Sequence, residues 1–61
     1  MTEGDKVKCI GCGIDTGKGQ GETGVITGFA RFSSHHAREA MVKLNNGQSD
    51  WFWLNDLKVV S

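Results

Sequence analysis

Glycine is concentrated in one part of this 61-residue chain, and this concentration limits the folds that the chain can adopt. Six of the nine glycines fall between Gly11 and Gly24, where Ile14 is the one large apolar side chain. A stretch with so little to bury cannot pack into a core, so we expect one long, mobile loop over residues 11–24. The core must therefore come from the segments on either side.

Short β-strand patterns flank this loop. Residues 5–10 alternate polar and apolar, which predicts a half-buried strand with Val7 and Cys9 facing inward. Residues 23–31 are rich in β-branched and aromatic side chains, which favours a second strand. Gly28 within this segment predicts a bulge or a sharp bend.

The C-terminal half predicts a hairpin followed by a last strand. Two apolar runs, residues 40–44 and 49–54, flank an Asn-Gly pair, which is the strongest short-range hairpin signal. A tight turn and a short strand follow over residues 55–60. We therefore predict an all-β fold of about five antiparallel strands, with the hairpin tip at Asn46-Gly47.

One segment also fits a helix. Four apolar residues fall at helical spacing: Ala37, Ala40, Met41 and Leu44. The alternative is therefore an α+β fold with a helix over residues 35–45. We favour a strand because the apolar residues from 40 to 44 also alternate cleanly, and because the aromatic run that follows needs a pairing partner.

Length and composition indicate a single domain over residues 1–61. A chain of this length buries only about 60% of the surface that its unfolded form exposes. Such small domains often gain stability from a partner subunit, so the chain could form an oligomer. Apolar residues make up 38% of the chain, enough for one small core but not for a deep enclosed cavity.

The charge balance argues against general nucleic-acid binding. Seven Lys and Arg residues equal seven Asp and Glu residues, whereas proteins that bind DNA or RNA electrostatically usually carry a clear basic excess. No charged segment followed by an apolar run marks a signal peptide at the start, and no run approaches the ~20 apolar residues that span a bilayer. We expect a cytoplasmic protein that does not enter the membrane.

The order of these motifs resembles that of SH3-like barrels. The shared features are a Gly-Asp-Lys-Val opening at residues 4–7, a long loop, a Gly-Val-Ile-x-Gly-Phe strand at 24–29, a Val-x-Leu-x-x-Gly hairpin at 42–47, and a final turn and strand at 54–59. The resemblance covers most of the chain and implies a small barrel with a 3₁₀ turn before its last strand. SH3 domains, Tudor and KOW modules and type II dihydrofolate reductases share this pattern, so the resemblance supports a fold more firmly than a function.

The enzyme in this group has its own signature. Type II dihydrofolate reductases are tetramers of SH3-like chains that build one active pore from a Val-Gln-Ile-Tyr segment. Residues 49–52 read Ser-Asp-Trp-Phe at the equivalent place, so the Gln and Tyr that meet folate and nicotinamide are missing. We expect a non-enzymatic protein without a cofactor. An oligomeric enzyme of this kind is one alternative, and a nucleic-acid-binding KOW-like or Tudor-like module is another.

Two cysteines raise the question of a metal. Cys9-x-x-Cys12 followed by glycine resembles the knuckle of a zinc ribbon, but zinc takes four ligands. Within one chain only His35 and His36 could complete the set, and adjacent histidines point apart in an extended chain. Two subunits could instead supply two cysteines each. We expect Cys9 in the core, Cys12 as a loop thiol and no required metal, with a zinc-binding domain as the alternative.

The triplet Trp51-Phe52-Trp53 is the most informative candidate site. Alternate residues of a strand face opposite sides, so Phe52 and the tryptophans separate. We predict that Phe52 packs inward with three apolar companions: Leu54, Leu57 and Val59. The opposite orientation would bury the tryptophans instead.

With Phe52 inside, the two tryptophans form an exposed apolar patch of the kind that marks an interface. We predict that this patch meets a partner protein or a second copy of the chain, through Trp51, Trp53, Asn55, Asp15 and Glu22. Peptide-binding SH3 domains carry an aromatic residue, a proline and an Asn at the places of residues 51, 53 and 55. The tyrosines of their long loop are absent here, so we do not expect proline-rich ligands. By analogy, phage and plasmid chains of this size often act by docking onto host machinery.

Overall fold

The computed structural model describes residues 1–29 and 39–60, which form one antiparallel five-stranded sheet. The strands are β1 (Lys6–Cys9), β2 (Thr23–Phe29), β3 (Glu39–Leu44), β4 (Ser49–Trp53) and β5 (Leu57–Val59), with a 3₁₀ turn, η1 (Leu54–Asp56), before the last. Their order across the sheet is β4-β3-β2-β1-β5. The all-β prediction is confirmed, and so is the short turn before the final strand.

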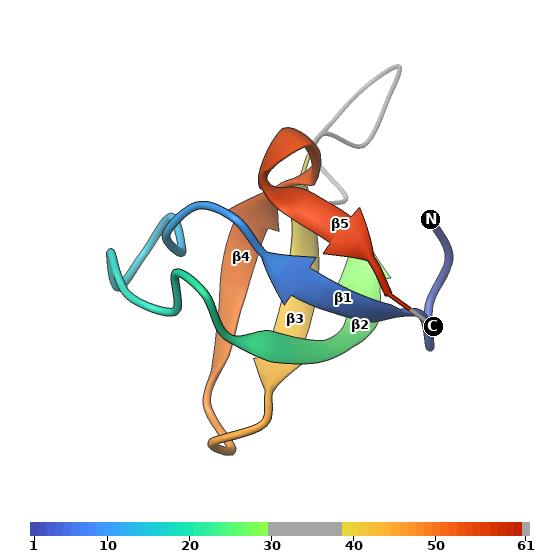
Figure 1. Cartoon of the computed structure of the whole chain (residues 1–61), viewed down its shortest axis with the longest axis horizontal. Helices are drawn as coiled ribbons and strands as arrows, with labels where there is room; N and C mark the ends of the chain where they lie inside the picture. Colours follow the sequence, from blue (N-terminus) through green and yellow to red (C-terminus); the bar gives the residue numbers. More distant parts are fainter. Residues whose placement is uncertain (30–38, 61) are drawn as a thin grey trace.

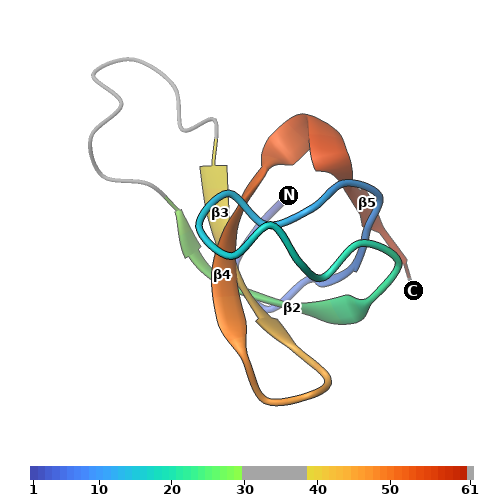
Figure 2. The same ribbon diagram turned by 90° about the vertical axis from the view of Figure 1, so that its left-hand side faces the viewer.

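The sheet curls until its two ends face each other. In Figure 1, β1 and β5 lie in front of β3, and in Figure 2 β3 and β4 lie on the left and β5 on the right, with β2 crossing between them. β2 belongs to both halves because it pairs with β1 on one edge and β3 on the other. The apolar side of every strand can therefore meet in one place.

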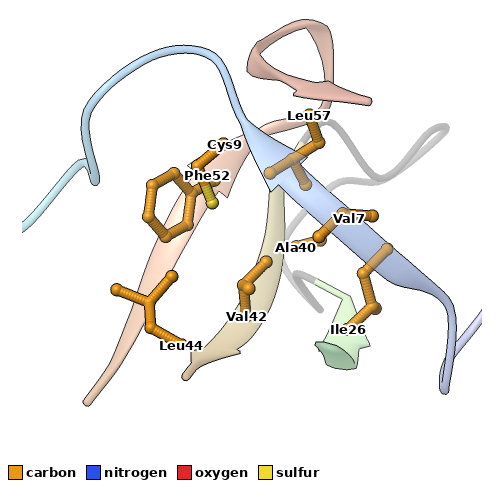
Figure 3. Close-up of a cluster of buried hydrophobic side chains, with 8 residues drawn as sticks. All are labelled: Val7, Cys9, Ile26, Ala40, Val42, Leu44, Phe52 and Leu57. Carbon is orange, nitrogen blue, oxygen red and sulfur yellow. The ribbon is translucent and has the colours of Figure 1, made fainter. Parts of the chain in front are cut away.

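That meeting place is a single core to which all five strands contribute. Its buried members are Val7, Cys9, Ile26, Ala40, Val42, Leu44, Phe52 and Leu57 (Figure 3). Lys6 and Lys8 alternate with the buried residues of β1 and face water, as predicted. One predicted core companion of Phe52 is wrong: Val59 exposes 46% of its surface, because it lies at the end of the edge strand β5.

The segment with two interpretations is a strand where the structure describes it. Residues 39–44 pair with both β2 and β4, and Ala40, Val42 and Leu44 are buried in alternation. The alternative helix over residues 35–45 is therefore wrong for these six residues, because the period-2 pattern places every other side chain in the core. Residues 30–38 lie outside the described part of the chain.

Two local predictions about turns and bends are confirmed. The β3–β4 hairpin turns at Asn46-Gly47, where Gly47 has a φ of 92° and donates its N–H to the Leu44 carbonyl at 2.9 Å. The β2–β3 register shifts between Ile26 and Gly28, which is the bulge expected from this glycine. The residues between β1 and β2, numbers 10–22, form the long loop, which we call the glycine-rich loop; β2 begins at Thr23, the first residue of the predicted strand.

Candidate functional site

Strand β4 separates the aromatic triplet onto two faces. Phe52 is fully buried, Trp51 is half-buried, and Trp53 exposes 46% of its surface. The predicted orientation of Phe52 is therefore confirmed. Figure 3 shows its ring among the core side chains of β1 and β3.

The outer side of β3 and β4 carries a continuous set of larger side chains. Met41 lies opposite Trp51, and Glu39 lies opposite Trp53, in the β3–β4 register. Cβ atoms of such directly opposed residues lie about 4.5–5.5 Å apart, so these side chains adjoin. We call the surface of Glu39, Met41, Trp51 and Trp53 the outer aromatic face. It combines apolar area with one carboxylate.

A glycine extends this face onto the neighbouring strand. Gly28 of β2 lies opposite Met41 across the β2–β3 pair. A Cβ added at Gly28 would meet nothing within 4 Å, so the position beside Met41 is open. The surface beside the Trp51–Met41 pair therefore has a shallow gap where Gly28 has no side chain.

The glycine-rich loop runs along the free edge of β4. The Ile14 N–H donates to the Trp51 carbonyl at 2.8 Å, so the loop covers part of an edge that β3 leaves unpaired. Ile14 remains 37% exposed there and adds apolar area beside the outer aromatic face. Asp15 follows directly and is exposed.

The side chain of Asp50 holds the loop in this place. It is buried, and its carboxylate accepts the backbone N–H groups of Asp15 and Thr16 at 3.2 and 3.1 Å. The Thr16 hydroxyl and the Trp51 N–H also donate to it, each at 2.6 Å. Burial acts to raise the pKa of Asp50, but the hydrogen bonds from Thr16, Trp51 and Asp15 outweigh it and hold that pKa below its ordinary value.

Asp50 and Thr16 also line an open hollow of about 570 Å³. It is bounded by the glycine-rich loop and the β3–β4 hairpin, and Lys18, Glu22, Asn46 and Gln48 are among its lining residues. Gly19 lets the loop backbone close over the core here, since a Cβ on it would lie 3.0 Å from the Phe52 ring. The hollow faces solvent with polar groups of both charges.

The predicted binding residues therefore fall in two places. Trp51 and Trp53 belong to the outer aromatic face, Asp15 lies in the loop segment bonded to Trp51, and Asn55 is exposed in η1 directly after β4. Glu22 lines the hollow instead. Sequence reasoning did not select Ile14, Met41 or Asp50, although the inward position of Asp50 in an alternating strand was visible.

The two cysteines lie in different environments. Cys9 is buried in the core, and Cys12 is exposed, with its thiol 3.8 Å from the Gln20 side-chain oxygen. Burial, and then the negative charge of Glu22, raise the pKa of the Cys9 thiol. Within residues 1–29 and 39–60, no three His, Cys, Asp or Glu side chains gather as a metal site would require. His35 and His36 lie outside those ranges.

This difference predicts selective thiol chemistry. We expect Cys12 to react at once with Ellman's reagent at neutral pH, and Cys9 only after unfolding, because the reactive species is an accessible thiolate. Absorbance in buffer and in guanidinium chloride measures the two steps, and Cys12→Ser should remove the first alone. Equal rates for both thiols in the folded protein would contradict the burial of Cys9.

The sequence matches no protein-family model, and no curated protein matches it significantly. Among solved structures, the chain is similar to the solution structure of PetP, a subunit of the cyanobacterial cytochrome b6f complex. The TM-score is 0.74 and the sequence identity 27%, over 100% of this chain and 81% of PetP. The architecture is therefore one that a small subunit of a larger protein complex also has. No helix in the described ranges is long and apolar enough to cross a membrane.

Proposed function

We propose that this chain is a small, non-enzymatic SH3-like module that docks onto a larger protein complex through its outer aromatic face. The observation that carries the proposal is the exposure of Trp53 beside the half-buried Trp51 on one side of β4. Asp15 and Asn55 would form the rim of the contact. We also propose that the protein is cytoplasmic, as expected from the sequence.

The energetic argument starts from apolar surface left in water. Fully burying a large apolar side chain contributes about 1.5–3 kcal/mol, and aromatic residues bury more area than aliphatic ones. Trp53 forgoes much of this contribution in the isolated chain because nearly half of it is exposed. Tryptophan is also among the residues that dominate protein interfaces. A partner that covers this face would recover the missing contribution.

Two further observations support docking over the other functions that the resemblance allows. PetP, which has the same architecture, is a subunit of a protein complex. The zero net charge lends no support to a nucleic-acid module, because each phosphate contact needs a basic side chain. The SH3-like assignment itself is supported by the strand order and by the 3₁₀ turn before β5.

The test measures association with a defined complex and with the chain itself. We expect the purified chain to bind detergent-solubilised cyanobacterial cytochrome b6f complex, and Trp53→Ala to weaken binding at least tenfold while the fold stays intact. Biolayer interferometry gives the affinity, and sedimentation velocity measures self-association. Val59→Ala is the matched control, since Val59 has the same exposed fraction as Trp53 but lies on β5.

Three results would contradict the proposal. One is a wild-type chain that stays monomeric and does not bind the complex. Another is unchanged affinity in the Trp53→Ala variant. The third is sub-micromolar, salt-sensitive binding to a random DNA duplex in the same instrument, which would make a KOW-like or Tudor-like role the leading one. Lys6 and Lys8, both exposed on β1, would then be the first residues to replace.

A further inference from the structure

Asp50 is a buried charged residue that does not belong to the apolar core. Asp50 occupies an inward position of β4, between strand residues that face outward, and exposes only 4% of its surface. A buried carboxylate is costly unless hydrogen bonds replace the water that it has lost. Its partners here are four donors, and they come from just three residues: Asp15, Thr16 and Trp51.

The origin of these donors connects the two parts of the docking surface. Asp15 and Thr16 belong to the glycine-rich loop, 35 and 34 residues before Asp50 in the chain. Trp51 belongs to the outer aromatic face. One oxygen, Oδ1, accepts both the Asp15 N–H and the Trp51 N–H, so a single atom joins the loop rim to the aromatic strand.

The packing around the carboxylate is close enough to define the loop path. A Cβ added at Gly13 would lie 1.9 Å from Oδ2 of Asp50, so only glycine fits there. The Thr16 hydroxyl donates to that same oxygen and accepts the Lys18 N–H at 3.1 Å, which extends the network along the loop. Asp50 is therefore the side chain that this network shares, in addition to the backbone bond from Ile14 to Trp51.

We propose that Asp50 is a positioning residue of the docking surface: its carboxylate holds Ile14 and Asp15 against the edge of β4 beside Trp51. This inference rests on the proposed function, since it assigns the docking surface a second, loop-derived part. With the loop held in advance, a partner does not have to order it on binding, and the entropic cost of association is lower. Without the carboxylate, the outer aromatic face stays in place while its rim separates from it.

Amide hydrogen exchange followed by NMR tests the positioning role without a partner. In Asp50→Asn and Thr16→Val we expect the N–H groups of Asp15 and Thr16 to exchange at least tenfold faster than in the wild type. Core amides such as Val42 should keep their rates. Asp5→Asn is the matched control, because Asp5 accepts similar bonds from Thr2 at the far N-terminus. Because Thr16 is exposed, the Thr16→Val variant should fold. It therefore tests the inference even if the Asp50→Asn variant does not fold.

Binding to the cytochrome b6f complex then separates this inference from the proposed function. We expect Thr16→Val and Asp50→Asn to weaken binding about tenfold, and Asp5→Asn to leave it unchanged. Unchanged exchange at Asp15 and Thr16 would overturn the inference, and so would uniformly faster exchange across the core. Faster loop exchange with wild-type affinity would also overturn it, while leaving the aromatic face as the docking site. Loss of the Trp53 effect would instead remove the proposed function itself.

Discussion

Replacing Phe52 with Ala is expected to lower the free energy of unfolding by about 3–5 kcal/mol. Phe52 is fully buried and is among the largest of the fully buried side chains. Truncating a buried phenylalanine costs about 3–5 kcal/mol, from lost transfer free energy and from the cavity left behind. Domains are stable by roughly 0.05–0.15 kcal/mol per residue, or about 3–9 kcal/mol for a chain of this length. The loss is therefore at least about a third of the free energy of unfolding, and equals all of it at the lower end of that range.

Urea denaturation followed by circular dichroism measures this effect. Trp53→Ala is the comparison, because Trp53 is the next residue but lies on the solvent side of β4. We expect that variant to lose less than about 1 kcal/mol, as surface substitutions usually do. A folded Phe52→Ala protein combined with an unfolded Trp53→Ala protein would mean that the two faces of β4 are reversed.

Local patterns in the sequence were enough to predict the strands. The alternation around Val7 and from Ala40 to Leu44, together with Asn46-Gly47, determined which residues pair and which enter the core. These signals are local, since each depends only on neighbours a few positions apart. The 3₁₀ turn at residues 54–56 was predicted differently, from the resemblance of the chain to SH3-like barrels.

The arrangement of the glycine-rich loop depends on contacts that no local pattern shows. Its composition predicted a long loop with nothing to bury, yet Gly13 and Gly19 pack closely against Asp50 and Phe52. Both contacts join residues more than thirty positions apart, and the donors to Asp50 are mostly backbone N–H groups, which every sequence contains. The role of Asp50 could have been suspected only from a charged residue at an inward position.

The candidate site also combines features that local sequence patterns predict with features that depend on long-range contacts. The outward orientation of Trp51 and Trp53 followed from strand period and from the apolar residues near Phe52. Glu22 was grouped with them because it lies in the loop, but it lines the hollow instead. Met41 joins the surface through cross-strand pairing with Trp51, which requires the hairpin register as well as the strand pattern.

Gly24→Ala is expected to destabilise the sheet strongly although it adds only one methyl group. Gly24 is buried in β2, with β1 on one side and β3 on the other. A Cβ added there would lie 2.5 Å from the Lys43 carbonyl oxygen and 3.0 Å from the Leu44 Cα. Backbone atoms of a paired strand cannot turn aside as a side chain can, so β2 and β3 must separate. Overpacking of this kind costs about 1–3 kcal/mol, and more where the backbone must move.

Gly28→Ala in the same strand is the matched control. A Cβ at Gly28 would meet nothing within 4 Å, and its φ is not positive, so alanine fits without strain. Reduced freedom in the unfolded chain should make that variant equal to the wild type or more stable by a few tenths of a kcal/mol. Urea midpoints of the two variants give the comparison directly. Equal midpoints would mean that β2 and β3 do not approach each other at Gly24 as closely as this register requires. A loss of stability confined to Gly24→Ala would confirm that β2 and β3 pair this closely only because residue 24 has no side chain.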